Sequence, residues 1–500
     1  MGACTPYRAI PLTRLEIPRE VSPEPGARPP RIRYRIEGTE WWAYMEVRRI
    51  DAPFLYGRAT TGNPPAATAY DVTVDSRTIA ELQVYFDEGR VWSRIGIVTG
   101  AVASAAAGVG LIVGLVALAT KTSCPFVFVE TPEGVRLVGE GYSGATVRAI
   151  QRDDLLELPP LAGATARLVL SNHAFETQRT DRLELQIVEH APDERAVAGA
   201  DARPLRVGAA RAPLRVTTLD GRALPAPTSA GGRLWESDMG AAARAAVPPL
   251  RDGLEVTFAP STDGAAPVLE LDVANTPWID VVLGRMFAAF GDGLGEYLAS
   301  QEAPSQAAGQ RSWREREGVD LAVEVPDGAG WRTVARVPTP GPAAVRHVAV
   351  ALPRVRAGEP VRVRLVAGTG FWRVGTLALS ALRDGAVPMV RVAPSRAVQP
   401  DGTDGRALLA ETDGAYQVLA RRGDRLALEF DLPSVPAGRA HTAFLFANGY
   451  YSVHPPPQAS RSVGTLLRLR DEPGAMARFG IDLYRALERT VRDAPREAPR

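Results

Sequence analysis

The chain has little of the residue types that carry most enzyme chemistry. Its 500 residues include two cysteines, Cys4 and Cys124, and five histidines. No two histidines stand at the i, i+2 or i, i+4 spacing of a paired metal motif. Two isolated cysteines make neither a disulfide framework nor a zinc site. The sequence therefore predicts no catalytic residue, no cofactor, no cofactor-binding residue and no metal ligand.

An excess of charge of one sign is also absent, and Lys121 is the only lysine. The 58 basic residues balance 57 acidic ones, which leaves a formal net charge of +1. A nucleic-acid-binding surface needs a basic excess, and here the arginines are spread over every segment. We therefore expect no nucleic acid among the partners of this protein.

Short alternating segments dominate what is present. The chain contains 47 glycines and 42 prolines, and 45% of its residues are hydrophobic, which is typical of a globular chain with many turns. Hydrophobic residues at every second position predict strands, and the length predicts three or four folding units. The fold class that follows is mainly β: a small N-terminal β-unit, one apolar helix that spans a membrane, then two or three β-sandwich-like units and a C-terminal amphipathic helix.

Changes of composition divide the chain into seven segments. We expect, in chain order, a tether with a candidate lipoprotein N-terminus (1–30), a small β-domain (31–93), the apolar helix (94–121), a β-domain (122–248), a β-sandwich-like domain with an inserted helix (249–385), a C-terminal β-module (386–470), and an amphipathic helix with a tail (471–500).

Helical spacing of apolar residues marks two of these segments. The inserted helix is predicted near 279–300, and the C-terminal helix carries an apolar stripe with arginines opposite it, formed by Met476, Phe479, Leu483, Leu487 and Val491. Passages rich in proline, glycine and alanine at 195–233 and 302–311 are predicted to be loops or linkers.

The apolar run has two interpretations, a membrane span or a buried helix of a soluble protein. A helix over its 26 residues, Ile95 to Thr120, would be roughly 39 Å long, against about 30 Å of bilayer hydrocarbon. Small residues also recur at a spacing suited to close helix packing and self-association: Gly96, Gly100, Ser104, Gly108, Gly110 and Gly114. We expect a membrane-embedded helix that self-associates through this face.

Cys4 is the candidate for lipidation. It closes "MGAC", which matches the end of a bacterial lipoprotein signal, but no basic or apolar region precedes it. Either the natural start lies upstream or the match is accidental. Arg90 and Arg94 slightly outweigh Lys121 across the apolar run, which favours residues 124–500 outside the cytoplasm. A lipidated Cys4 would instead keep residues 5–94 outside. Cys124, which precedes a strand pattern, is expected to be a buried thiol.

Two glycine-rich motifs come close to known sites without matching them. "GEGYSGA", from Gly139 to Ala145, lacks the second glycine of a nucleophile elbow and is predicted to be a β-turn. "GDGLGE", at 291–296, lacks the ligand spacing of an EF-hand loop.

Several motifs resemble an uncharacterised group of bacterial envelope proteins and lipoproteins. They are "VTVDSRTIAELQV" before the apolar run, then "SCPFVFV", "GEGYSGATVRAIQRDDLLEL", "LSNHAFETQRTDRLELQIVEHAP" and "RLWESD". The end of the chain, "RRGDRLALEFDLP" and "TAFLFANGYY", is similar to a β-module that closes several large bacterial surface proteins. The resemblance covers roughly 60–480. It implies a β-rich fold in the cell envelope and brings no known activity.

Two functions follow as hypotheses. The first is a non-enzymatic, membrane-attached envelope protein whose β-domains bind a protein partner or act as a scaffold. The alternative is a carbohydrate-binding or glycan-processing envelope protein, in which Trp331 or Trp372 stacks on sugar and paired carboxylates come from Asp320, Glu324 or Asp327.

Overall fold

A computed structural model describes most of the chain after residue 124 and six strands before it. The described residues are 7–10, 31–36, 43–51, 54–60, 70–75, 79–85 and 125–493, except 132–133, 162, 173, 175, 226–233, 261–265, 357, 435–437 and 455–460. The predictions for Cys4, Cys124 and the apolar run with its six small residues lie outside them. Within the described part, no helix combines the length and apolar character needed to cross a bilayer.

The N-terminal strands form one antiparallel sheet in the order β1-β6-β2-β3-β4-β5. Their bounds are Tyr7–Ile10 (β1), Arg31–Ile36 (β2), Ala43–Asp51 (β3), Phe54–Thr60 (β4), Tyr70–Asp75 (β5) and Ile79–Tyr85 (β6). Tyr34, Met45 and Val74 are buried in it. The first strand falls within the range predicted as a tether and pairs with β6, Tyr7 opposite Tyr85.

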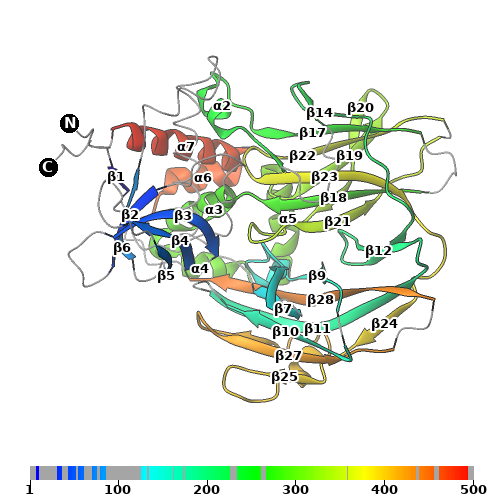
Figure 1. Cartoon of the computed structure of the whole chain (residues 1–500). Coiled ribbons are helices and arrows are strands. Elements are labelled where there is room, and N and C mark those ends of the chain that lie inside the picture. Colours follow the sequence, from blue (N-terminus) through cyan, green and yellow to red (C-terminus); the bar gives the residue numbers. More distant parts are fainter. Residues whose placement is uncertain are drawn as a thin grey trace.

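Four further sheets are stacked as two β-sandwiches (Figure 1). The chain is therefore mainly β with several sheets, as the alternating patterns predict. In the first sandwich, one sheet has the order β25-β27-β10-β7-β8 and the other β24-β11-β28-β9, with β26 paired to β11. Its strands are Phe126–Thr131 (β7), Gly134–Glu140 (β8), Arg152–Glu157 (β9), Thr165–Ser171 (β10), Glu176–His190 (β11), Met389–Val392 (β24), Arg396–Val398 (β25), Gln417–Leu419 (β26), Arg425–Asp431 (β27) and Ala440–Val453 (β28).

The second sandwich packs β15-β14-β17-β22-β19-β20 against β16-β23-β18-β21. Its strands are Arg215–Thr218 (β14), Ala223–Leu224 (β15), Trp235–Glu236 (β16), Arg251–Phe258 (β17), Pro267–Asn275 (β18), Leu321–Asp327 (β19), Gly330–Val337 (β20), Arg346–Ala351 (β21), Val361–Gly368 (β22) and Trp372–Ala381 (β23). Alternation explains the packing: Val361, Val363 and Leu365 are buried, while Arg362 between them is exposed.

The second sandwich is an insertion within the first. Strand β10 pairs with β27 along its whole length, and β11 pairs with β28 from Glu176 to His190. Residues 126–190 and 389–453 are thus the two halves of one sandwich, called here the split sandwich. Residues 215–381 form the inserted sandwich. The sequence ranges 122–248 and 386–470 therefore contribute strands to the same two sheets.

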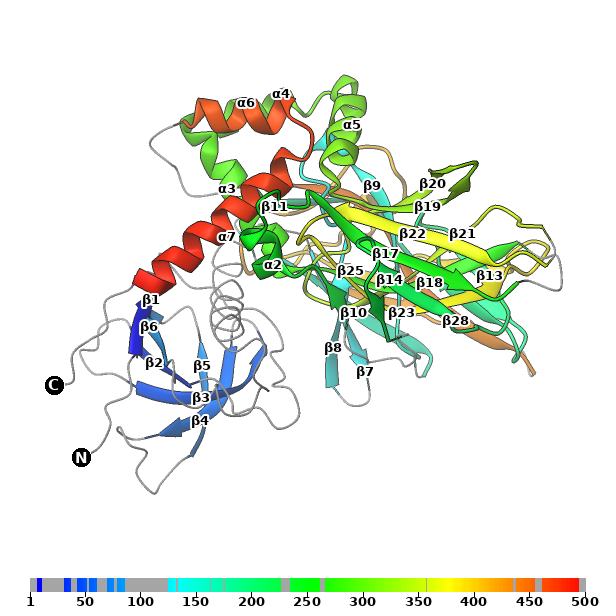
Figure 2. The ribbon, with the colours of Figure 1, turned by 90° about the horizontal axis from the view of Figure 1, so that it is seen from above.

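The helices gather at one end of the sandwiches, as the two views agree (Figures 1 and 2). They are Met239–Arg244 (α2), Pro277–Ala289 (α3), Leu294–Ser300 (α4), Ala307–Glu317 (α5), Val463–Asp471 (α6) and Ala475–Asp493 (α7), with 3-10 turns at Arg148–Ile150 (η3), Gly291–Gly293 (η4), Pro304–Gln306 (η5) and Arg406–Leu409 (η6). Pro277 begins α3 at the position where a missing N–H costs nothing. Gly318 ends α5 in the left-handed region, at a φ of 67°.

Two predicted loops contain regular structure. The passage 195–233 includes the hairpin of β12, Arg195–Ala198, and β13, Pro204–Val207, and the passage 302–311 includes the start of α5. Tertiary contacts explain why the first passage forms a hairpin and not a loop. Its residues Ala196, Val197, Ala198 and Val207 are buried between the sandwiches, where β12 contacts β21 and β28. Composition alone carries no information about such burial.

Candidate binding site

The junction between the sandwiches brings several charged groups together around one buried carboxylate, Glu270. Glu270 is 1% exposed and accepts hydrogen bonds from Arg195, at 2.8 and 3.0 Å, and from Ser380. The His347 ring lies between two carboxylates, with Nε2 2.9 Å from Glu270 and Nδ1 2.9 Å from Asp272. These contacts give His347 a structural role, in which it links two carboxylates of the same strand.

Their hydrogen-bond partners shift the pKa values of His347 and Glu270. Burial opposes protonation of His347, but hydrogen bonds to Asp272 and Glu270 outweigh it and raise the pKa to about 9. Burial likewise opposes ionisation of Glu270, yet hydrogen bonds from His347, Arg195 and Ser380 lower its pKa to about 2. Each charge is therefore stable as an ion within the junction, and none is poised for proton transfer near neutral pH.

A second buried pair crosses the same junction. Arg346 of the inserted sandwich donates two hydrogen bonds to Asp154 of the split sandwich, at 2.8 and 3.0 Å, and both side chains are under 10% exposed. Burial would raise the pKa of Asp154, but the charges of Arg152 and Arg346 lower it to about 2. The pair fixes how the two sandwiches meet.

The turn predicted at "GEGYSGA" is present and adjoins this junction. Residues 141–144 form a turn after β8, and Ser143 is buried, with its carbonyl oxygen accepting from Thr339 and Arg152. Tyr142 has a φ of 35° and is fully buried, with its hydroxyl 2.9 Å from Thr180 Oγ1. No helix follows Ser143 directly, so the geometry is that of a structural turn rather than a nucleophile elbow.

The tryptophans and aspartates named for sugar recognition have protein partners in the structure. Trp372 is 1% exposed, and its indole N–H donates to Val319 O at 2.9 Å. The ring of Trp331 carries the Arg364 guanidinium 4.2 Å from its centroid. Asp320 is paired with Arg314 at 2.5 Å, whereas Asp327 lies 3.7 Å from Arg332. Among the described residues, no hydrogen bond joins any two of Asp320, Glu324 and Asp327, and both tryptophans have structural partners.

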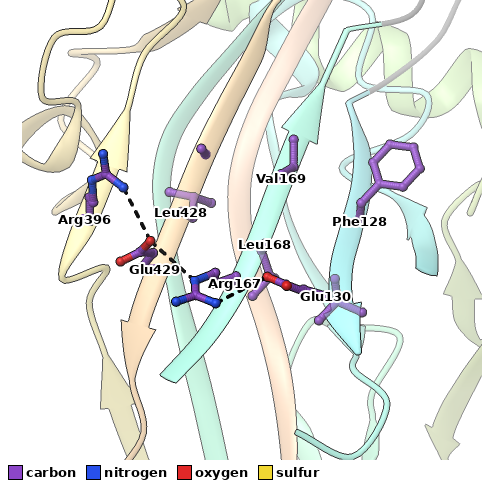
Figure 3. A pocket seen from close by; sticks show the side chains of 10 residues that line it. Phe128, Glu130, Arg167, Leu168, Val169, Arg396, Leu428 and Glu429 are labelled. Atoms are coloured by element: carbon purple, nitrogen blue, oxygen red, sulfur yellow. Dashed lines mark hydrogen bonds and ion pairs between the residues drawn. The ribbon is translucent and has the colours of Figure 1, made fainter. Parts of the chain in front are cut away.

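A shallow depression lies on the outer face of the split sandwich (Figure 3). Its volume is about 160 Å³, and Arg167 crosses it between Glu130, at 3.6 Å, and Glu429, at 3.5 Å. Arg396 on the edge strand also pairs with Glu429, at 3.4 Å. These four charged groups neutralise one another, so none of them is left unpaired to orient a ligand in the depression.

A larger cavity, of about 620 Å³, lies between the helices and the end of the split sandwich. The helical wall comes from α3, η4 and α4, and includes Phe287, Leu294 and Leu298; the opposite wall comes from β11 and β28, with Arg179, Tyr450 and Val453. The turn at Gly291, where φ is 57°, separates α3 from α4 and places "GDGLGE" along the rim. We refer to this space as the helix–sheet cavity.

The polar groups of the helix–sheet cavity are few. The Arg179 guanidinium lies 5.3 Å from the centre of the Tyr450 ring, and Nη1 donates to Ser452 Oγ at 3.1 Å. The pKa of His454 is lowered, first by burial and then by the charge of Arg179. No group of three metal-ligating side chains occurs among the described residues, here or elsewhere. The arrangement can hold a ligand and offers no acid–base pair.

Sequence patterns gave no indication of this cavity. Arg179 and Tyr450 are adjacent across the β11–β28 ladder, yet they lie on strands from opposite halves of the split sandwich. The sequence predicts two features that line part of the cavity, the helix near 279–300 and the glycine-rich "GDGLGE" at 291–296, but not the space between them and the strands. Alternation in β11 indicates that Arg179 shares a face with Thr177, but not what covers that face.

Comparisons with known proteins do not assign the chain to a family. No family model matches it, and no curated protein matches it. Among solved structures, one similarity is to the M60 catalytic domain with the CBM51-1 and CBM51-2 domains from Clostridium perfringens ZmpB. The identity is 10%, the match covers 77% of this chain and 33% of that chain, and the TM-score is 0.11. The chain thus spans about a third of that solved chain's length, and a likeness this low supports no conclusion.

Proposed function

We propose that this chain is a non-enzymatic binding protein of the bacterial cell envelope, in which the helix–sheet cavity receives a small ligand. The cavity is the observation that carries the proposal. Its volume of about 620 Å³ lies within the roughly 300–1,000 Å³ typical of ligand sites, and its walls combine apolar side chains with a few polar groups. The buried titratable groups of the junction, by contrast, are engaged in ion pairs.

Membrane attachment is a second part of the proposal and rests on the sequence alone. The apolar run at 94–121 would supply a membrane-embedded helix, with self-association through its glycine face, and Cys4 is the candidate lipid site. The β-domains would then lie outside the cytoplasm, where a ligand or an envelope protein can reach the cavity.

Binding in the cavity can be tested with two matched glycine variants. Gly295 and Gly309 are both exposed helical glycines, and a Cβ added at either meets no atom within 4 Å. Gly295 lines the cavity, and Gly309, on α5, does not. We expect the uncharged dye Nile red to bind the wild-type protein and Gly309→Trp, and to lose its fluorescence gain with Gly295→Trp. Equal binding by the two variants would contradict the proposal.

Membrane attachment can be tested by washing membranes with alkaline carbonate. The proposed helix predicts that the protein stays in the pellet, and that Cys4→Ser stays there too. Release of Cys4→Ser into the wash would show that lipid is the anchor. Protease added to spheroplasts should cleave the β-domains, and their protection would overturn the proposed orientation.

A further inference from the structure

Arg179 differs from three arginines that lie against buried surfaces elsewhere in the molecule. Arg195, Arg314 and Arg346 each donate to a carboxylate at 3.0 Å or less. Arg179 is half-buried, and no ion pair joins it to a carboxylate of the described residues; its two hydrogen bonds to that part of the chain, to Ser452 Oγ and to the Thr177 carbonyl, both come from Nη1. The guanidinium has five N–H donors in a planar fork. Its Nε and Nη2 atoms make no hydrogen bond within the described part of the chain, and the side chain lines the cavity.

Neighbouring groups leave the positive charge of Arg179 in place. Stacking on Tyr450 orients the guanidinium plane and costs it no donor. His454 lies on the same wall, and burial together with the Arg179 charge lowers its pKa, so its ring is neutral at neutral pH. Glu302 also lines the cavity but forms no ion pair with Arg179 among the described contacts. Asp292, the other carboxylate of the lining, is paired with Arg461 at 4.0 Å. Arg179 thus puts a positive charge on the strand wall, while the two carboxylates come from the helical segment.

Three apolar side chains, Phe287, Leu294 and Leu298, line the wall opposite Arg179. Phe287 and Leu294 are under 10% exposed, and Leu298 of α4 continues the same surface. On the strand wall, which also carries Arg179, Val453 of β28 is 1% exposed and lines the cavity. An apolar body placed between these side chains would exchange water for contact with hydrocarbon, which is favourable in proportion to the area covered.

We infer that the helix–sheet cavity selects an amphipathic anion, with its carboxylate or similar head on Arg179 and its apolar body against Phe287, Leu294 and Leu298. The inference rests on the proposed binding function and adds the chemical class of the ligand. A carboxylate matches the planar fork of a guanidinium in two parallel hydrogen bonds, which gives both charge neutralisation and orientation. A ligand without the anion would leave the guanidinium partly desolvated and unpaired.

Three probes with the same apolar body test the selectivity. Octanoate, octan-1-ol and octylammonium are each titrated to displace Nile red from the wild-type protein, from Arg179→Met and from Arg179→Lys. We expect octanoate to bind at least about ten-fold more tightly than octan-1-ol, as hydrogen bonds to an ion contribute on this scale. Arg179→Met should remove that preference without weakening octan-1-ol, and Arg179→Lys should restore part of it.

Glu302→Gln provides a second variant that does not alter the arginine. Because it removes a negative charge from the cavity, octanoate should bind more tightly and octan-1-ol should not change. Equal affinity for octanoate and octan-1-ol, or a preference for octylammonium, would overturn the anion assignment and leave the binding function intact. Failure of Nile red to distinguish Gly295→Trp from Gly309→Trp would instead count against the binding function itself.

Discussion

Charged side chains have different roles in two regions of the molecule. One region is the junction between the two sandwiches, and the other is the helix–sheet cavity. At the junction, Glu270, His347 and the Asp154–Arg346 pair are each held by partners of opposite charge. In the cavity, Arg179 faces open space with no carboxylate of the described residues paired to it. A buried ion that is fully paired specifies how two surfaces meet, whereas an ion left without a counter-charge at a cavity wall is available to a ligand.

Breaking the Arg346–Asp154 pair should have the largest effect on stability. Arg346→Met leaves a buried carboxylate without its main partner, and such a change typically costs about 3–5 kcal/mol. We expect the lower end of that range, because Arg152 still faces Asp154 at 3.4 Å. Urea unfolding at pH 7 measures the loss. Arg332→Met, which removes the exposed partner of Asp327, is the control and should leave the midpoint unchanged. Similar midpoints for both variants would show that the junction pair adds no stability.

His347 should make stability depend on pH on the alkaline side. The pKa of His347 is raised to about 9 in the folded state, so its contribution is complete below about pH 6.5, its ordinary value, and is lost as the pH rises through about 9. His347→Gln should therefore cost up to about 3 kcal/mol at pH 6 and progressively less towards pH 10.

The difference in unfolding free energy between the wild-type protein and His347→Gln, measured from pH 6 to pH 10, isolates the contribution of His347. Glu157, Glu270, Asp272 and Arg195 surround it in both, so their own titration largely cancels in the difference. The same cost at every pH would mean that His347 contributes packing but no charge.

Arg179→Met should have the smallest effect on folding. The variant keeps an apolar stem beside Tyr450 and loses a cation–π contact at 5.3 Å, so the free energy of unfolding should fall by less than about 1 kcal/mol. Urea unfolding under the conditions used for Arg346→Met gives a direct comparison. A loss as large as that of the junction variant would make Arg179 a structural residue and remove the contrast between the two regions.

The alternation of apolar residues predicts where many strands lie, but not which strands pair with each other. Neighbouring segments with alternating apolar residues pair with each other, as β7 does with β8 and β19 with β20. The helix near 279–300 is present as α3 and α4, and the C-terminal helix as α7. Alternation says which residues face inward, but it does not say which strand lies beside which. The pairing of β10 with β27, for example, joins segments separated by the whole inserted sandwich.

The candidate site could not be predicted for the same reason. Arg179 is one arginine among many on predicted strands, and the sequence does not show that it lines a cavity without a carboxylate partner after folding. The cavity exists because the Gly291 turn directs α4 alongside the end of β28, which involves segments more than 150 residues apart. By contrast, core burial of Trp372 follows from its apolar character and its place in a strand.

The division of one sandwich into two chain segments also has a consequence for synthesis. Strand β11 ends at His190, and the strand that pairs with it along its full length begins at Ala440, about 250 residues later. At roughly 5–20 residues per second, a ribosome needs roughly 12–50 s to cover that interval. During this time the backbone of β11 cannot form its native ladder with β28, and its N–H and C=O groups remain open to other strands. The nascent chain is thus most exposed to misassembly after β11 has emerged and before β28 has been made.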